Sequence, residues 1–282
     1  MIEIRHCDNL KLMAEMEDNT VDLIYCDILY GTGRKFADYQ DLKPEREIIE
    51  EHYIPRIKEM HRILKDTGSI YLQMDTKINH WLRCILDDIF GYDKFINEII
   101  VNNKRGGNGK FFLKRHDNIL FYSKTSKILF NKNRGDKYKL KNQAGKWARV
   151  LNNYKGSLPY PDEIMNQMKG YKNITSQKIN KNGAYLSDVW ESENSNYRTR
   201  LYDTQKPKSL IERVIKASSN EGDLVADFYA GSFTTAEVCK DLNRNFIGCD
   251  ISEKAVQIGL ARVDGEKIKE NTKQITLFDA GT

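Results

Sequence analysis

The first hundred residues alternate short apolar runs with segments of helical period. Val21–Cys26 is almost continuously apolar, which is typical of a strand buried on both faces of a parallel sheet. In Asp8–Met16 apolar residues recur every third or fourth position, which predicts a helix. The same two patterns predict strands at Ile2–Arg5, Ser69–Met74, Phe95–Val101 and Asn118–Tyr122, and helices at Glu45–Lys65 and Lys77–Phe90. Pro55 is expected to kink or restart its helix, and Asp66-Thr67-Gly68 to end it.

This regularity is lost over residues 123–185 and returns near residue 207. There the pattern predicts helices at Pro207–Ser218, Ser232–Leu242 and Glu253–Val263, and strands at Leu224–Asp227 and Asn245–Asp250. Strands that alternate with helices predict an α/β fold with a doubly wound, mostly parallel sheet. The irregular segment is then an insertion in the sheet domain, and residues from Asp264 onward form a polar tail.

The composition is that of a folded protein. The chain has 282 residues, which corresponds to one large domain or two small ones. Hydrophobic residues make up 40% and charged residues 30%, enough for a buried core and too apolar for a disordered chain. No apolar run approaches the roughly 20 residues that span a bilayer, and Met1–Arg5 does not begin a secretory signal. We therefore expect a cytoplasmic protein.

Neither a disulfide framework nor a metal site is expected. The five cysteines are odd in number and never spaced C-x-x-C, and the five histidines do not cluster at ligand spacing.

Charge is distributed unevenly along the chain. Residues 101–182 hold 19 basic and 4 acidic side chains, a net charge of +15, whereas the remainder holds 26 basic and 36 acidic, a net charge of −10. A basic block of this size indicates a polyanionic partner, with nucleic acid the first candidate. Its interleaved aromatic and Asn residues suit phosphate contacts and base stacking. A lysine-rich solvated surface would have the same composition, so both interpretations stay open.

A small-residue turn follows the strand Leu224–Asp227. Ligands of open α/β sheets bind beyond the carboxyl ends of such strands, and Asp250, which ends the next strand, is placed to bind a ribose diol. The turn has one glycine, Gly231, where a dinucleotide fingerprint has three, so NAD is disfavoured. S-adenosylmethionine, which has no pyrophosphate, fits better. A plain strand–turn–helix would give the same pattern.

A second acid, Asp27, ends the strand Val21–Cys26 and precedes an aromatic residue, Tyr30. Together they could grip and stack a planar base that bears an amine. The alternative is an Asp that caps a turn and a Tyr packed in the core. Thr204-Gln205-Lys206-Pro207 precedes a predicted helix, and Pro at a first helical position is ordinary by itself.

Taken together, these segments resemble the site-specific DNA amino-methyltransferases of restriction–modification systems. The order of motifs is that of the β-group, in which the base-binding motif precedes the cofactor-binding motif. Asp27-Ile28-Leu29-Tyr30 stands where D-P-P-Y is expected, residues 227–235 stand where D-P-F-A-G-S-G-T-T is expected, and residues 204–207 match T-Q-K-P. The resemblance implies a Rossmann-like sheet that uses S-adenosylmethionine.

The resemblance also implies roles for individual residues. Asp27 would accept one amine hydrogen of a flipped-out base and the Ile28 carbonyl the other, while Tyr30 stacks on the base. The implied catalytic residues are Asp27, Ile28, Leu29 and Tyr30. The implied cofactor-binding residues are Asp8, Asp27, Thr204, Gln205, Lys206, Pro207, Asp227, Phe228, Tyr229, Ala230, Gly231, Thr234 and Asp250. Residues expected to contact DNA are Lys104, Arg105, Lys110, Lys114 and Arg115.

The resemblance further implies a domain organisation and partners. Residues 1–125 and 184–263 form the methyltransferase domain, 126–183 an inserted target-recognition region whose basic stretch begins near 101, and 264–282 a polar tail. The substrate is double-stranded DNA, and a homodimer and a cognate restriction enzyme are possible partners. Asp rather than Ser at position 27 favours adenine N6 as the acceptor over cytosine N4.

Departures from the family pattern at four positions bear on activity. Ile28 and Leu29 replace two prolines, which would leave the catalytic loop less preorganised. Phe233 replaces a glycine and is expected to crowd the cofactor or force another turn, and Cys7 replaces the glycine before Asp8. These changes keep open a third interpretation, a DNA-binding homologue with impaired catalysis.

Overall fold

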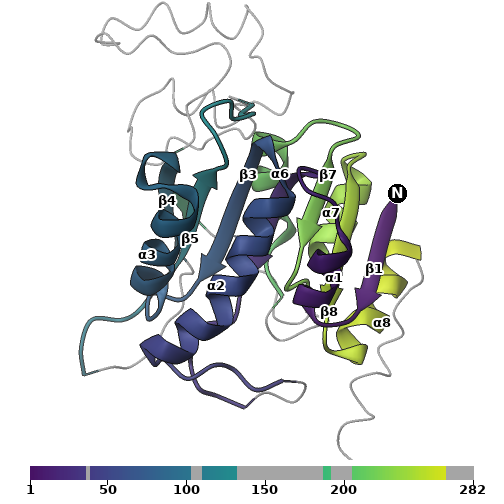
Figure 1. Cartoon of the computed structure of the whole chain (residues 1–282). Helices are drawn as coiled ribbons and strands as arrows, with labels where there is room; N and C mark the ends of the chain where they lie inside the picture. Colours follow the sequence, from purple (N-terminus) through teal and green to yellow (C-terminus); the bar gives the residue numbers. More distant parts are fainter. Residues whose placement is uncertain (36–38, 103–109, 132–186, 192–204, 265–282) are drawn as a thin grey trace, which may run out of the picture. The chain divides into compact units, whose positions relative to one another are not determined.

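The computed structural model describes residues 1–35, 39–102, 110–131, 187–191 and 205–264 (Figure 1). The chain divides into two compact units, one made of Met1–Asn131 with Val189–Thr282 and the other of Lys132–Asp188. The described residues lie almost wholly in the first unit, which is the subject below. Most of the predicted insertion 126–183 and the tail from residue 265 lie outside the described residues.

The described strands of the first unit form one eight-stranded sheet in the order β1-β8-β7-β2-β3-β5-β4-β6. Their bounds are β1 (Ile2–His6), β8 (Asn245–Asp250), β7 (Leu224–Asp227), β2 (Val21–Asp27), β3 (Leu64–Met74), β5 (His116–Ser123), β4 (Phe95–Asn102) and β6 (Val189–Glu191). The strands from β1 to β3 pair in parallel, whereas β5 is antiparallel to both β3 and β4. β6 adds a short parallel edge to β4.

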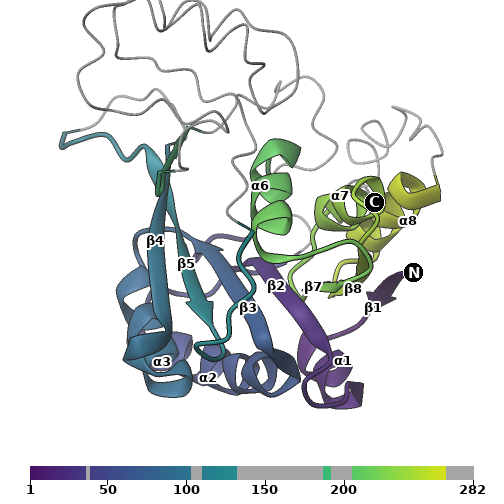
Figure 2. The ribbon, with the colours of Figure 1, turned by 90° about the horizontal axis from the view of Figure 1, so that it is seen from above.

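Helices cover both faces of this sheet (Figure 2). The helices α1 (Asn9–Glu15), α2 (Arg46–Ile63) and α3 (Asn79–Phe90) lie on one face, and α6 (Lys208–Ser218), α7 (Thr234–Asp241) and α8 (Glu253–Asp264) on the other. A hydrophobic core fills each of the two spaces between helices and sheet. The fold is therefore the expected doubly wound α/β sheet. Strands in such a sheet are buried on both faces, which is why they carry apolar side chains on both.

The structure differs from the sequence prediction in two details. α2 does not restart at Pro55: the helix is continuous through the proline, and Tyr53 and Ile57 on either side of it are buried. β3 begins at Leu64 rather than Ser69, because Leu64 already pairs with Val21 before the register shifts. The turn expected at residues 66–68 is thus an irregular stretch inside the strand.

The sheet order places two acids at adjacent strand ends. β2 and β7 are neighbours, paired through Leu23 with Val225 and Ile24 with Ala226. The helices that follow them, α2 and α7, lie on opposite faces of the sheet. A crevice forms at such a switch point, beyond the carboxyl ends of the strands. Asp27 and Asp227 are the last residues of these two strands.

Candidate active site

Asp27 is anchored through one of its two carboxylate oxygens. Its Oδ1 accepts a hydrogen bond from the Tyr30 hydroxyl at 3.0 Å and pairs with the Lys206 ammonium at 3.1 Å. Within the part of the chain that the structure describes, no hydrogen-bond partner is recorded for Oδ2. Asp27 can therefore hold its position and still offer an acceptor to a ligand.

Asp117, the second residue of β5, completes this cluster. Its Oδ2 lies 3.1 Å from the Tyr30 hydroxyl and 3.6 Å from the Lys206 ammonium. Gln73 of β3 also donates to it, at 3.4 Å. Lys206 in turn donates to the Tyr30 hydroxyl and lies 4.7 Å from the centre of its ring. One ammonium and one hydroxyl are thus shared between two carboxylates.

Burial governs the protonation of this cluster. Burial raises the pKa of Asp27, the Asp117 charge raises it further, and the Lys206 ammonium opposes both. The pKa of Tyr30 is raised well above its ordinary value, first by burial and then by the two carboxylates. Tyr30 consequently remains a hydroxyl donor at neutral pH.

The loop after β2 is fixed by hydrogen bonds rather than by prolines. The Ile28 N–H donates to the Gln73 carbonyl at 3.1 Å, a bond that proline could not make, and the Ile28 side chain is buried. The Tyr53 hydroxyl donates to the Leu29 carbonyl at 2.9 Å. The Asp41 carboxylate accepts from the N–H groups of residues 31 and 32 at 3.1 and 2.7 Å. These four anchors offset the preorganisation that the missing prolines would have supplied.

Asp227 organises the loop between β7 and α7. It is 2% exposed and accepts from the Tyr229 N–H at 3.1 Å and the Thr235 hydroxyl at 2.7 Å. Burial raises the pKa of Asp227 to about 7, although both donors oppose the rise. At the end of β8, Asp250 accepts from the Gly231 N–H at 2.9 Å. The two carboxylates therefore hold the same turn by hydrogen bonds.

Phe233 has a backbone conformation that favours glycine. Its φ is +54°, in the left-handed region that favours glycine. Its ring is fully buried and lies edge-on to Phe246. A Cβ added to Gly259 of α8 would lie only 2.5 Å from this ring. The ring thus packs in the core, where the small residue on α8 makes room for it. That Phe233 affects the bound cofactor stays a prediction.

A polar group surrounds the end of β1. Arg56 on α2 donates to the side chains of Asp8 and Asn9 at 3.1 and 2.8 Å, and Asn9 donates to the Phe228 carbonyl at 3.0 Å. His52 lies 3.0 Å from the Tyr229 hydroxyl. Burial, followed by the Arg56 charge, lowers the pKa of His52 to about 4, so the ring is neutral at pH 7. These contacts tie Asp8 to the loop after β7.

The remaining predicted site residues lie in several places. Pro207 precedes α6, and the Gln205 side chain accepts from Arg262 of α8 at 2.8 Å. Ala230 and Thr234 are buried, and Leu29 is half-buried. Lys110, Lys114 and Arg115 precede β5, and Lys114 pairs with Asp75. Lys104, Arg105 and Thr204 lie outside the described residues.

Neither a metal centre nor a membrane span is found in the described segments. In them, no three His, Cys, Asp or Glu side chains are grouped so as to hold a metal ion. None of the helices in the same segments combines the length and the apolar composition needed to cross a bilayer.

The sequence profile of the DNA methylase family N6_N4_Mtase matches residues 21–261, most of the chain. The chain belongs to this DNA methylase family. The resemblance inferred from the motifs is thereby confirmed, and the chain is a DNA methyltransferase.

Characterised relatives of this DNA methylase match nearly its whole length. The type II methyltransferase M.HpaI of Haemophilus parainfluenzae is 32% identical over 267 residues, which cover 92% of this chain and 74% of the relative. The DNA adenine methyltransferase YhdJ of Escherichia coli (strain K12) is 30% identical over 267 residues, with 93% and 82% covered.

Solved structures share the fold of this methylase. The M1.HpyAVI–SAM complex superposes with a TM-score of 0.58 at 17% identity, covering 94% of this chain and all of the neighbour. The PvuII DNA methyltransferase (cytosine-N4-specific) gives 0.63 at 15% identity, covering 93% and 86%.

The sequence prediction of the methylase site missed Asp117. The sequence pattern points to acids at the carboxyl ends of predicted strands, whereas Asp117 stands near the amino end of β5. Because β5 runs antiparallel to β3, its first residues lie at the same edge as the last residues of β2 and β3. Asp117 could have been identified only from the direction of β5, and the pattern of apolar residues does not reveal the direction of a strand. Arg56 was missed because it lies in mid-helix.

Proposed function

We propose that this DNA methyltransferase transfers a methyl group from S-adenosylmethionine to the N6 amine of an adenine flipped out of duplex DNA at a specific sequence. The observation that carries the proposal is the state of Asp27 at the end of β2. Its Oδ1 is anchored by Tyr30 and Lys206, while no described partner occupies its Oδ2. This is the arrangement that a carboxylate needs to receive an amine hydrogen in a fixed direction.

The chemistry asks the protein mainly for alignment. The lone pair of the exocyclic amine is delocalised into the ring, so the amine attacks only when its hydrogens are held by acceptors. Asp27 Oδ2 and the Ile28 carbonyl would serve as these acceptors, and Tyr30 would stack on the extruded base. The bonds that fix Ile28 and Leu29 would keep both acceptors in place.

The loop between β7 and α7 fits an S-adenosylmethionine site. A Cβ on Gly231 would meet no atom within 4 Å, so the loop is open at this residue. Asp250 and Asp8 would bind the ribose and adenine parts, and Gln205, Lys206 and Pro207 the methionine end. The bound cofactor supplies a methyl group already activated by the sulfonium.

Four observations favour adenine methylation by an active enzyme. Asp stands at position 27, and the relative YhdJ is named a DNA adenine methyltransferase. The catalytic loop is anchored without the two prolines, and the Phe233 side chain is buried in the core. These contacts weigh against the interpretation of a catalytically impaired homologue.

The test is methyl transfer to genomic DNA from a host without adenine methylation. With tritiated S-adenosylmethionine, we expect label in N6-methyladenine at one short sequence, and Asp27→Ala should lower the rate by at least about 100-fold, the usual scale for a positioned catalytic group. Calorimetry should show that the variant still binds the cofactor. Label in N4-methylcytosine would overturn the choice of base, and no label from the wild type would overturn the proposed activity.

The partners and the place of action remain part of the proposal. Residues 126–183 are proposed to recognise the target sequence, with Lys110, Lys114 and Arg115 on the DNA backbone. A homodimer, a cognate restriction enzyme and a cytoplasmic location remain predictions.

A further inference from the structure

Two adjacent phenylalanines before β5 are almost completely exposed. Phe111 is 81% and Phe112 105% exposed, and the following Leu113 is 40% exposed. Removing an aromatic ring from water is favourable, so two adjacent rings in contact with solvent indicate a surface with an occupant. The occupant has to offer apolar faces to the rings.

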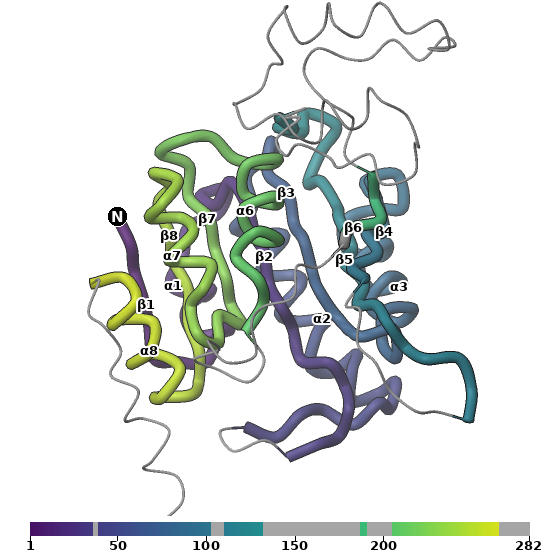
Figure 3. The backbone as a smooth tube through the Cα atoms, turned by 180° about the vertical axis from the view of Figure 1, so that it is seen from behind, coloured from purple at the N-terminus to yellow at the C-terminus, as the bar shows by residue number. Residues whose placement is uncertain are grey.

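The exposed rings lie at the edge of the sheet that holds Asp27. β2 and β3 end together, with Asp27 beside Gln73, and Met74 of β3 lies beside Asn118 of β5. Lys114 pairs with Asp75, the residue after β3, and so fixes the segment at this edge. Figure 3 shows the segment after β2 and the teal segment before β5 at the same end of the sheet.

The distance along the chain from the catalytic cluster is short. Phe111 is six residues from Asp117, which contacts Tyr30. Six extended residues span at most about 20 Å, comparable with the diameter of a DNA duplex. A base held at Tyr30 would therefore leave its duplex within reach of Phe111 and Phe112.

The charges around the rings decide the kind of occupant. Lys110, Lys114 and Arg115 flank the three apolar residues, and the Lys110 ammonium lies 5.7 Å from the centre of the Phe111 ring. An apolar protein surface would have to bury the charges of Lys110 and Arg115 without offering them a partner, which is costly. Duplex DNA offers phosphates to the cations and, where a base has left the stack, two apolar base faces to a ring.

We propose that Phe111 and Phe112 intercalate into the DNA duplex at the position from which the target base is extruded. The rings stack on the bases that the extruded nucleotide has left and keep the gap from closing. Lys110 and Arg115 bind the flanking phosphates and direct the rings into the stack. The proposal rests on the proposed function and adds to it the part of the chain that keeps the target base out of the duplex.

The test compares the wild type with the double variant Phe111→Ala/Phe112→Ala on two substrates. The recognition sequence is first found by long-read sequencing of DNA from cells that express the gene. One substrate is a duplex oligonucleotide with that sequence. The other has an abasic site opposite the target adenine, which lowers the free energy needed to extrude the base. We expect kcat/KM on the paired duplex to fall about tenfold or more, the scale of lost aromatic–base stacking. On the abasic duplex the loss should be less than about threefold, because little pairing remains to be broken.

A fluorescent base reports extrusion directly. With 2-aminopurine in place of the target adenine, the wild type should increase the fluorescence, because the base leaves its stack, and the double variant should not. Phe111→Trp/Phe112→Trp should restore both fluorescence and kcat/KM, since indole also stacks on bases.

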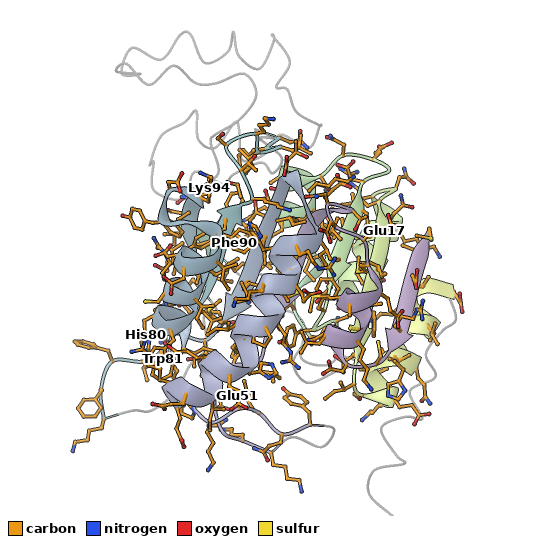
Figure 4. The ribbon with its side chains drawn as sticks, in the orientation of Figure 1. Glu17, Glu51, His80, Trp81, Phe90 and Lys94 are labelled. Carbon is orange, nitrogen blue, oxygen red and sulfur yellow. The ribbon has the colours of Figure 1, made fainter. Side chains whose placement is uncertain are left out.

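Tyr92→Ala is the matched control. Tyr92 is also a largely exposed aromatic residue, 76% exposed, in the one-turn 3₁₀ helix Tyr92–Lys94. Lys94 of this helix lies at the opposite end of α3 from His80 and Trp81 (Figure 4). This variant should leave both kcat/KM values unchanged.

A salt titration separates stacking from charge. Lys110→Ala should reduce the slope of log K against log salt concentration by about 1, because one phosphate contact is lost. The Phe111→Ala/Phe112→Ala variant should keep the wild-type slope.

Three results would overturn the proposal while leaving the proposed function intact. The first is equal kcat/KM for the wild type and the double variant on the paired duplex. The second is binding of the wild type, but not of the double variant, to phosphatidylglycerol vesicles with unchanged methylation, which would assign the rings to a membrane. The third is a dimer that dissociates in the double variant, which would assign them to a second copy. Inactivity of the wild type on both DNAs would instead overturn the proposed function.

Discussion

At the scale of single residues, the carboxylates of Asp27 and Asp117 form one electrostatic unit. They share the Tyr30 hydroxyl and the Lys206 ammonium, and the Asp117 charge disfavours ionisation of Asp27. The raised pKa of Asp27 therefore depends partly on Asp117. A protonated Asp27 accepts amine hydrogens poorly, so methyl transfer should fail as pH falls through that pKa.

Asp117→Asn should lower kcat. It should also move the acid limb of the profile of kcat against pH to lower pH. The shift follows because removal of the Asp117 charge lowers the pKa of Asp27. We expect kcat at neutral pH to fall about threefold to tenfold, corresponding to about 1 kcal/mol for a weakened hydrogen bond to Tyr30. Asp22→Asn is the control, since Asp22 pairs with Lys65 and lies near the beginning of β2. An Asp117→Asn profile with an unmoved acid limb would contradict the coupling.

At the scale of elements, the Phe233 ring before α7 packs against Gly259 of α8. Phe233 immediately precedes α7 with a positive φ, and its ring occupies the space that the missing side chain of Gly259 leaves on α8. The loop residue therefore combines a positive φ with a side chain that is buried in the core.

The effect of Gly259→Ala on the free energy of unfolding should have opposite signs with Phe and with Gly at position 233. In the wild type the new Cβ would lie 2.5 Å from the Phe233 ring, and overpacking should lower the free energy of unfolding by about 1–3 kcal/mol. In a Phe233→Gly background the ring is absent, so alanine should stabilise the helix by about 1 kcal/mol. Urea unfolding of the four variants gives the coupling energy. Equal effects in both backgrounds would show that the two positions are independent.

The elements also show what the sequence could and could not predict. Strands and helices were located because burial on both faces and helical period leave strong apolar patterns, as in Val21–Cys26. The acids at strand ends were located because parallel strands share an edge. The direction of β5 was not predictable, since an antiparallel strand buried on both faces has the same apolar pattern, and Asp117 was missed with it. The partner of Phe233 was not predictable because Gly259 is distant in sequence and ordinary in a helix.

At the scale of the whole molecule, the two units differ in charge. Lys132–Asp188 contains 12 basic and 4 acidic residues, a net charge of +8, whereas the rest of the chain contains 33 basic and 36 acidic residues, a net charge of −3. A unit of net negative charge gains little from a polyanion, apart from local groups such as Lys110 and Arg115. The electrostatic part of DNA binding should therefore come mainly from the basic unit.

Replacement of Lys132–Asp188 by a short Gly/Ser linker should separate cofactor binding from DNA binding. The proposed cofactor site, with Asp227, Asp250 and Asp8, lies wholly in the first unit. Calorimetry should therefore give a dissociation constant for S-adenosylmethionine within a few fold of the wild type. Binding to duplex DNA should weaken, and the slope of log K against log salt concentration should fall by about 0.9 for each phosphate contact removed. An unchanged slope would place the electrostatic contacts in the first unit, and the uneven charge of the chain would then have another cause.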